Sequence, residues 1–139
     1  MKTLALIFGL LFASYTLVAQ ETTGVTITVA IDNVVNDEGK IIIGLHTEET
    51  FMRAPGLINM ESTIENGKVS FTFEDVAEGT YAIIALHDAN ANNRMDYHSN
   101  GMPKEGYGMS RNEMVMGPPT FDVAKFEVGN EPLHFDIRL

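Results

Sequence analysis

Apolar and polar residues alternate with a period of two along much of the chain after residue 24. The alternation runs through residues 25–31, 69–73 and 133–139. Each of these segments would place its apolar side chains on one face, which predicts a β-strand with one buried and one solvated face. Residues 41–45 and 81–86 are apolar on both faces instead. They predict central strands that are covered on both sides.

Turn residues separate these segments. Asn36–Gly39 follows the first strand, Glu78–Thr80 precedes residues 81–86, and Asn66-Gly67 predicts a two-residue hairpin between residues 62–65 and 68–75. Residues 48–57 have room for one helical turn at most. The pattern predicts an all-β fold: an antiparallel β-sandwich of about seven strands, transthyretin-like or Ig-like, with one long ordered loop.

That long loop is Ala89–Thr120, which is rich in Asn, Gly, Pro and Met and has no sustained periodicity. A connection of this length inside a compact domain is usually either functional or disordered. Its many apolar residues favour an ordered segment that packs against the sandwich, over the outer face of the doubly apolar strands. They are Met95, Tyr97, Met102, Tyr107, Met109, Met114, Val115 and Met116. We therefore expect the functional site there.

The first 19 residues resemble a secretory signal peptide. Lys2 is followed by the uncharged apolar run Leu4–Phe12 and by smaller residues up to Ala19. The run is too short to span a bilayer, which takes about 20 residues. We expect cleavage after Ala19, a mature single domain from Gln20 to residue 139, and a periplasmic or extracellular location. No later apolar stretch has membrane length, so we expect no membrane span after processing.

Charge and cysteine content narrow the possible partners. Nine basic and 19 acidic residues give a net charge of −10, which argues against nucleic acid and leaves divalent cations as plausible partners. The chain has no cysteine. This excludes a lipid anchor on cysteine, thiol catalysis and thiolate zinc sites.

Residues 88–96 have the spacing D-x-N-x-N-N-x-x-D, which is typical of the first part of an EF-hand-type calcium loop. Four side chains and one backbone carbonyl would be the ligands: Asp88, Asn90, Asn92 and Asp96 through side-chain oxygens, and Arg94 through its carbonyl. Asn93 stands where such loops need a positive φ. Ser99 replaces the usual glutamate at the twelfth position, and no helices flank the loop. The alternative is an Asn-rich turn whose side chains cap their own backbone.

Histidine and methionine allow a second metal hypothesis. His46 and His87 end two strands that could be neighbours, and five of the seven methionines after residue 20 fall between Met95 and Met116. Imidazole and thioether groups suit copper(I). The alternative is that methionine fills gaps where a loop packs on a sheet. Hydrolysis has less support, because no serine lies in a G-x-S-x-G motif.

The chain resembles the bacterial domain-of-unknown-function family 2141. The resemblance runs from Val25 to Leu139 and rests on short motifs: Gly79-Thr-Tyr81, His87-Asp88-x-Asn90-x-Asn92, Pro103-Lys-Glu-Gly-Tyr-Gly108, Gly117-Pro-Pro-Thr-Phe121 and Ala124-Lys-Phe126. It implies an exported β-sandwich, transthyretin-like or carboxypeptidase-regulatory-like, and no established activity. The Gly-Thr-Tyr strand with its loop is also similar to the calcium-binding B repeats of Gram-positive surface adhesins.

Two functions from different classes remain open. The first is an exported, non-enzymatic binding or accessory module for an unknown protein or glycan ligand, with calcium holding the loop after the 81–87 strand. The second is an enzyme whose site lies in the long loop, with Glu105 and Tyr107 beside His87 or His98. A concave pocket with converging titratable groups would favour the enzyme, and a flat or apolar face the binding module.

Overall fold

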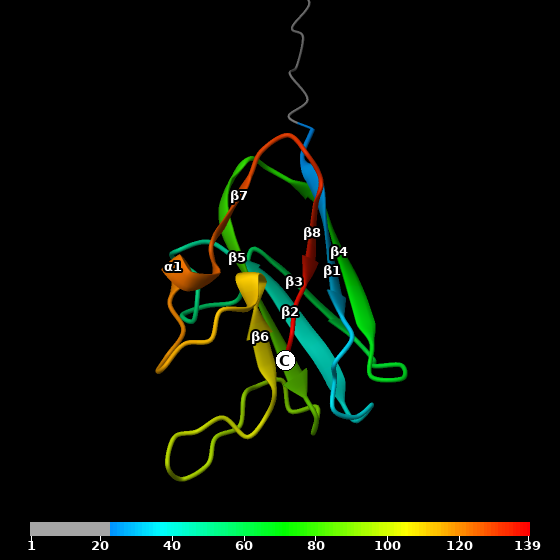
Figure 1. Cartoon of the computed structure of the whole chain (residues 1–139), viewed down its shortest axis with the longest axis vertical. Coiled ribbons are helices and arrows are strands. Elements are labelled where there is room, and N and C mark those ends of the chain that lie inside the picture. Colours follow the sequence, from blue (N-terminus) through cyan, green and yellow to red (C-terminus); the bar gives the residue numbers. More distant parts are fainter. Residues whose placement is uncertain (1–22) are drawn as a thin grey trace, which may run out of the picture.

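The computed structural model describes residues 23–139, so the expected leader and cleavage site lie outside the described residues. Within residues 23–139, no helix is long and apolar enough to cross a membrane. The described part of the chain forms eight strands with one 3₁₀ turn and one short helix (Figure 1). In order they are β1 Val25–Ile31, β2 Lys40–His46, β3 Ile58–Ser62, β4 Val69–Val76, β5 Gly79–Asp88, β6 Tyr107–Met109, η1 Ser110–Asn112, α1 Phe121–Ala124, β7 Phe126–Val128 and β8 Leu133–Asp136.

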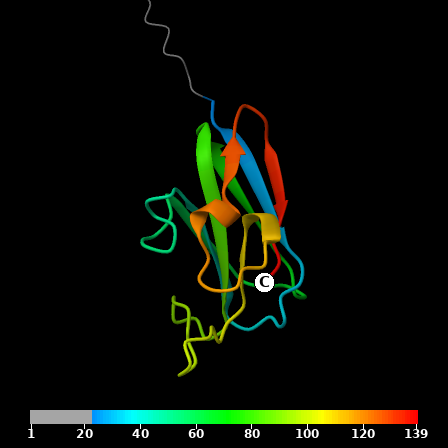
Figure 2. The same ribbon diagram turned by 60° about the vertical axis from the view of Figure 1, so that its left-hand side comes forward.

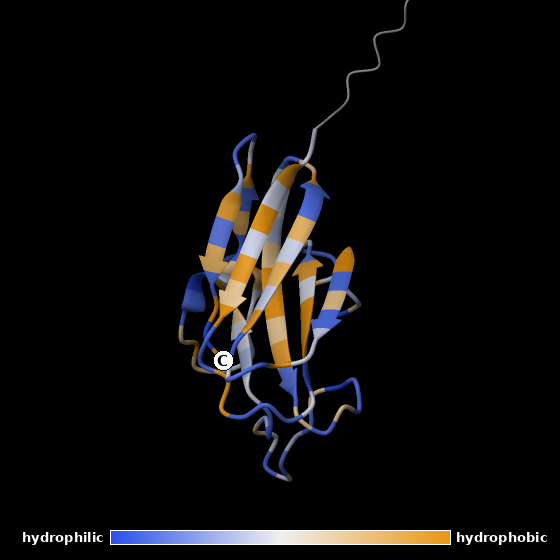
Figure 3. Cartoon of the chain, turned by 90° about the vertical axis from the view of Figure 1, so that its right-hand side faces the viewer, coloured by the Kyte–Doolittle hydropathy of each residue, from blue (hydrophilic) through white to orange (hydrophobic). Residues whose placement is uncertain are grey.

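The strands form two sheets, and the predicted all-β sandwich is confirmed. One sheet has the order β4-β1-β8, and the other has the order β3-β2-β5-β6, with β7 also paired to β5. Apolar side chains from both sheets form the core between them, including Ile27, Ile43, Phe73 and Ile83. The predicted alternation is visible as apolar and polar bands along the strands (Figure 3).

The doubly apolar strands β2 and β5 are central, as predicted. They pair antiparallel, with Ile43 opposite Ala85. The side chains of Ile41, Ile43 and Leu45 are fully buried in the core between the sheets. The opposite face of β5 is covered in part by the segment that follows β6: Ala82 is buried there, whereas Ile84 and Leu86 stay half-buried.

The prediction of a wholly antiparallel sandwich is wrong at one pair. Strand β8 runs parallel to β1, from Ile27 opposite Leu133 to Ala30 opposite Asp136. Strand β7 pairs antiparallel to β5 in one sheet. The chain then crosses to the other sheet, where β8 lies beside β1 and runs in the same direction as β1. Alternation fixes which face of a strand is buried but not the direction of the strand, so the pattern could not reveal this pair.

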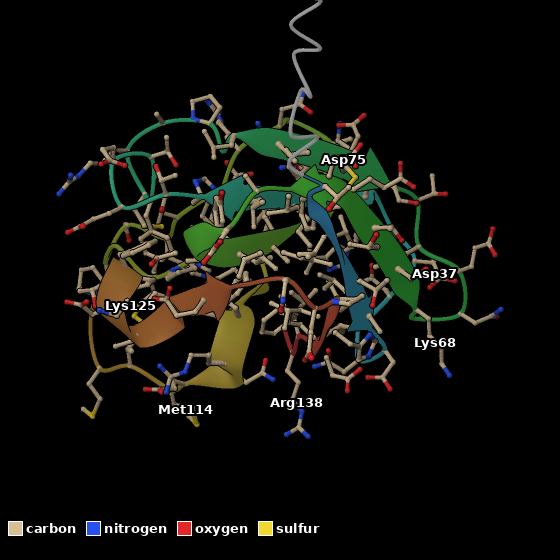
Figure 4. The ribbon with its side chains drawn as sticks, turned by 90° about the horizontal axis from the view of Figure 1, so that it is seen from above. Asp37, Lys68, Asp75, Met114, Lys125 and Arg138 are labelled. Carbon is tan, nitrogen blue, oxygen red and sulfur yellow. The ribbon has the colours of Figure 1, made fainter. Side chains whose placement is uncertain are left out.

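The Asn66-Gly67 turn forms as predicted, but the hairpin around it does not. Both residues have positive φ, 53° and 72°, and Glu65 and Lys68 form a single bridge. Beyond that bridge the chain separates, because β3 pairs with β2 and β4 pairs with β1. The carboxylate of Asp37 accepts hydrogen bonds from both turn N–H groups, at 3.0 and 2.7 Å. Asp37 and Lys68 lie at the same corner of the sandwich (Figure 4).

Residues 47–54 form the short helical turn that the sequence allowed. The amide of Phe51 donates to the Thr47 carbonyl, and the amide of Ala54 donates to the Thr50 carbonyl, each at 3.0 Å. Met52 has a φ of 56°, which ends any regular helix there. The turn places Phe51, which is buried, on the outer side of the sheet that contains β2 and β5.

Candidate functional site

The outer face of β5 and the short strand β6 form the base of the candidate site. Leu86 of β5 is opposite Tyr107 of β6, and Ile84 is opposite Met109. Gly108 lies between the two β6 side chains, and a Cβ there would come within 2.1 Å of the Arg138 carbonyl oxygen. The C-terminal segment therefore passes directly behind β6, and only glycine allows that approach.

Ser110 fastens the segment that leaves the sheet after β6. The Ser110 hydroxyl is fully buried, accepts a hydrogen bond from the Ile83 amide at 3.0 Å and donates one to the Ala124 carbonyl at 2.5 Å. β6 pairs with one end of β5 and β7 with the other. The hydroxyl therefore gives Ile83, in the middle of β5, a hydrogen-bond partner between the two short strands. Nothing in the sequence pattern pointed to this role.

A second apolar cluster covers the outer face of β5. Phe51, Ala82, Met109 and Ala124 are buried in it, and Val115 and Phe121 pack against it. Figure 2 shows the segment from β6 to α1 beside β5. The expected packing of the long loop is confirmed there at Met109 and Val115. It is wrong for Met114 and Met116, whose exposed fractions are 100% and 105%. Met114 points away from the sandwich (Figure 4).

The proposed calcium ligands lie on one tightly coiled loop. Asp88 is fully buried at the end of β5, and its two carboxylate oxygens accept hydrogen bonds from the amides of Asn92 and Asn93, at 3.0 and 2.8 Å. Asn93 has the predicted positive φ, 64°. The Asn90 and Asn92 side-chain oxygens accept hydrogen bonds from backbone amides two residues further on, each at 3.1 Å.

Asp96 receives the side-chain amides of this loop. Asn90 and Asn92 donate to the same carboxylate oxygen of Asp96, at 2.6 and 2.8 Å. Chiefly the hydrogen bond from Asn90 holds the pKa of Asp96 below its ordinary value, although desolvation opposes this. The sequence brings Asp88, both asparagines and Asp96 together as expected, and the hydrogen-bond pattern is that of a self-capped turn.

Glu105 closes the loop, a role that sequence reasoning did not assign to it. Its two carboxylate oxygens accept hydrogen bonds from the amides of Ala89 and Asp96, each at 3.1 Å. The Lys104 amide donates to the Asp96 carbonyl at 2.8 Å, and the His87 amide donates to the Gly106 carbonyl at the same distance. Residues 88–105 are therefore tied at their base by one charged side chain.

Beyond this tie, residues 97–103 form a small hairpin at the tip of the loop. Tyr97 bridges to Pro103, and the His98 amide donates to the Met102 carbonyl at 2.8 Å. Gly101 has a φ of 81°, which suits the tight reversal. The tip projects beyond the end of the sheet (Figure 1). Tyr97 and Met102 remain 55% and 60% exposed, so the expectation that both are packed is wrong.

A cavity of about 500 Å³ lies between the outer face of β5 and the long loop. Ile84 and Leu86 form its floor. Its walls come from three separate segments: Met52 from the helical turn, Met95, Tyr97, Met102, Pro103 and Tyr107 from the 88–107 region, and Val115, Pro118 and Pro119 from the segment after η1. Within residues 23–139, no histidine, lysine, arginine or carboxylate lines it.

The residues suggested for an enzyme are not brought together in this cavity. Of Glu105, Tyr107, His87 and His98, only Tyr107 lines the cavity. His87 is buried and its Nε2 lies 2.8 Å from the Glu38 carbonyl oxygen, while Glu105 caps two backbone amides. His98 is exposed at the hairpin tip.

The histidine pair expected for copper is also separated. β2 and β5 are neighbours, as anticipated, but they are antiparallel, so His46 is opposite Ala82 and His87 is opposite Ile41. The two imidazoles lie at opposite ends of the strand pair. Among the described residues, no group of three or more histidine, aspartate or glutamate side chains is placed to hold a metal ion.

A second, more open hollow is polar, and two of its groups have a pKa that is shifted away from the range useful for proton transfer. Glu49, Asp122, Lys125 and Glu127 are among the residues that line it. The carboxylate of Asp122 raises the pKa of Lys125, and a hydrogen bond from Thr47 lowers the pKa of Glu49. Both shifts move these groups away from neutral pH, whereas general acid–base catalysis favours a pKa near the working pH.

A hydrogen-bonded row on the outside of the other sheet has the residue types of a catalytic triad. Thr28 Oγ1 lies 2.8 Å from His134 Nδ1, and His134 Nε2 lies 3.2 Å from Asp136 Oδ1. The three groups lie on a solvated sheet face outside both hollows. Thr28 lies on a strand paired on both sides, so the neighbouring amides are used by the sheet and cannot stabilise an oxyanion.

Comparison with known proteins identifies the family. The chain belongs to the family of uncharacterized proteins conserved in bacteria (DUF2141), whose sequence model matches residues 29–136. The matched range includes the whole candidate site, from the helical turn at residue 47 to α1. No curated protein and no solved structure matches the chain.

Proposed function

We propose that this member of the family is an exported binding module that holds a ligand in the cavity between β5 and the long loop. The apolar lining of the cavity carries this proposal. A cavity of about 500 Å³ falls in the range of about 300–1,000 Å³ that ligand sites occupy. An apolar cavity of this size suits binding, whereas catalysis needs several titratable groups that converge on the substrate. The titratable groups in the lining are the phenols of Tyr97 and Tyr107.

The lining also bears on the expected protein or glycan ligand. A glycan presents many hydroxyl groups, and each would need a hydrogen-bond partner when removed from water. Methionine, proline and aliphatic side chains dominate the walls and cannot supply them. A protein partner could reach the cavity only through an inserted apolar side chain. The enzyme alternative, with Glu105, Tyr107 and His87 or His98, has no comparable support from the geometry.

Methyl NMR tests ligand binding with internal controls. Hexanol and benzyl alcohol would be titrated separately into protein with labelled methionine methyl groups. The wall methionines Met52, Met95 and Met102 should shift and saturate, whereas Met114 and Met116, which lie outside the cavity, should not. If neither alcohol produces saturable shifts at any wall methionine, the cavity is not a binding site.

The second part of the proposal is that a calcium ion stabilises the Asp88–Asp96 loop. Asp88 and Asp96 would supply two negative charges, Asn90 and Asn92 two amide oxygens, and Arg94 a carbonyl. The convergence of both asparagine side chains on Asp96 supports this arrangement. To bind calcium, each asparagine would have to turn its oxygen inward. Water or another oxygen would complete the usual six to eight ligands.

Without a bidentate glutamate, affinity should be weak, on the order of 0.1–1 mM. At about 1 mM calcium and a dissociation constant of about 0.1 mM, mass action contributes about 1.4 kcal/mol. For a domain of this size that is a rise in Tm of roughly 4–8 °C. Magnesium should do much less, because it demands octahedral geometry and releases its water reluctantly.

Thermal melting with calcium or with a chelator tests this part. Asp96→Ala should abolish the calcium-dependent rise, and Asn93→Gly should keep it, because glycine accepts the positive φ of that position. Asp88→Ala should abolish it too, but it also leaves two backbone amides without acceptors. Equal melting temperatures of the native chain in calcium and in chelator would show that the loop is only a turn.

Export is the third part, and it rests on the Lys2, Leu4–Phe12 and Ala19 pattern. Intact-mass measurement on protein recovered from the exported fraction of a bacterial host should give a chain that begins at or within a few residues of Gln20. Retention of residues 1–19 would overturn this part alone and leave the cavity and the calcium loop untouched.

A further inference from the structure

We infer that the ligand of the outer cavity is an uncharged aromatic small molecule, an inference that rests on the binding function proposed above. Three properties of the cavity lead to it: its charge, the chemistry of its walls, and the way its walls are built.

The lining of the cavity offers no charged partner to an ionic ligand. An anion would find no lysine, arginine or histidine in the lining, and the whole chain carries a net charge of −10. A cation would find no carboxylate there either. Burying an unpaired charge of either sign is costly, so an uncharged ligand is favoured.

The walls favour aromatic rings over alkyl chains. Tyr97 and Tyr107 can stack on a ring or meet its edge. Met52, Met95 and Met102 place thioethers in the same walls, and sulfur–aromatic contacts add to the area buried. An alkyl chain would gain the burial but neither of these contacts. Together they favour an aromatic ligand over an aliphatic one of equal area by about three- to tenfold.

The construction of the walls suits a compact ligand. The floor is the rigid central strand β5, and one wall is held by Ser110 between Ile83 and Ala124. The opposite wall is the hairpin tip, whose Tyr97 and Met102 are more than half exposed. The floor, the hydrogen-bonded wall and a volume of about 500 Å³ fit a molecule of a few rings.

Two fluorescent probes with one ring system provide the main test. N-phenyl-1-naphthylamine is uncharged, and 8-anilinonaphthalene-1-sulfonate is the same molecule with an added sulfonate. The uncharged probe should bind with saturable fluorescence, and the sulfonate should bind at least about tenfold more weakly, because the cavity offers it no cation. Decanol, an aliphatic competitor, should displace the uncharged probe less well than naphthalenemethanol does.

Variants assign the binding to the cavity. Tyr97→Leu keeps an apolar side chain but removes a ring. It should lower the affinity for the uncharged probe about threefold and leave the affinity for decanol unchanged. Val115→Trp places a large ring in the cavity and should weaken the binding of both probe and decanol. Met114→Ala is the matched control, because Met114 is on the same segment as Val115 but fully exposed, and it should change neither.

The outcomes separate this inference from the proposed function. If decanol binds at the cavity while the uncharged aromatic probe does not, or if the sulfonate binds as tightly as the uncharged probe, the aromatic inference is overturned and the binding function stands. Unchanged probe binding in Val115→Trp would overturn the inference as well, by placing the probe elsewhere. If neither decanol nor the uncharged aromatic probe binds, the proposed function fails together with the inference.

Discussion

The two faces of β5 are covered by different kinds of structure: a regular sheet on one side and an irregular segment on the other. The inner face meets a second sheet, and regular strands contribute Ile83 and its neighbours to one continuous core. The outer face is covered by an irregular segment with a few buried residues, one buried hydroxyl and a cavity. A regular sheet leaves little space for a ligand because side chains interdigitate at every second position. The irregular segment on the outer face leaves such space. That segment is held in place by a few individual contacts, such as the hydrogen bonds of Ser110.

The largest effect should come from a cavity made in the inner core. Phe73 is 1% exposed, so Phe73→Ala should lower the free energy of unfolding by about 3–5 kcal/mol, measured by urea denaturation. Met114→Ala, on the outer cover, should change it by less than about 0.5 kcal/mol. A loss below about 1 kcal/mol in Phe73→Ala would mean that the inner face is not the main source of stability.

The outer cover should also depend strongly on the buried hydroxyl of Ser110. Ser110→Ala removes the partners of a buried amide and a buried carbonyl, and should cost about 1–3 kcal/mol. Hydrogen exchange of the Ile83 amide should accelerate with it. Ser70→Ala, at an exposed site on β4, is the matched control and should have almost no effect. Slow exchange at Ile83 in Ser110→Ala would contradict this role.

Glu105 should matter less, because it is only partly buried. Glu105→Gln leaves one carbonyl oxygen for two backbone amides, so a loss of about 1 kcal/mol is expected. Amide NMR shifts should change at Ala89 and Asp96 and not in the inner core. Glu131→Gln, in the exposed turn before β8, is the control. Shifts spread across β1 and β4 would show that the loop and the core are not separable.

The smallest expected effect is the loss of the Asp96 hydrogen bonds at low pH. The pKa of Asp96 is lowered in the folded chain, so its hydrogen bonds stabilise the loop fully above the ordinary aspartate pKa of 3.8 and are lost as pH falls through the lower, folded value. An NMR titration should show the Asp96 carboxyl and the side-chain amides of Asn90 and Asn92 changing with one midpoint below 3.8. A midpoint at or above that value would contradict the observed hydrogen bonding.

The sequence predicted most of the inner structure and less of the outer. Alternation located β1 and β4, and the doubly apolar runs located β2 and β5, because each signal lies within one segment. Pairing was harder. The direction of β8 and the pairing of β3 with β2 are set by where the chain crosses from one sheet to the other. The periodicity within one segment does not show where these crossings occur.

In the candidate site, the sequence identified what is encoded locally. Asp88, Asn90 and Asn92 share one loop, and their spacing alone predicted the coil. Met52 and Ser110 were missed as site residues, because each acts on β5 from a distant part of the chain. Their residue types carry no signal, since methionine and serine are common in loops. Met114 was misplaced for the opposite reason: its hydrophobicity is real, but composition does not say which apolar residues are buried.

The parallel pair of β1 and β8 has a consequence for the order in which the chain folds. Ile27 lies opposite Leu133, so the first strand of the sandwich obtains its second neighbour from a segment that is far away in the sequence. Contacts that span so much sequence slow folding, because a long loop must close before they form. Until then β1 has an open edge and the three-stranded sheet is incomplete. Docking of β8 beside β1 is therefore expected to be a late step of folding, because β8 must reach β1 across most of the described sequence.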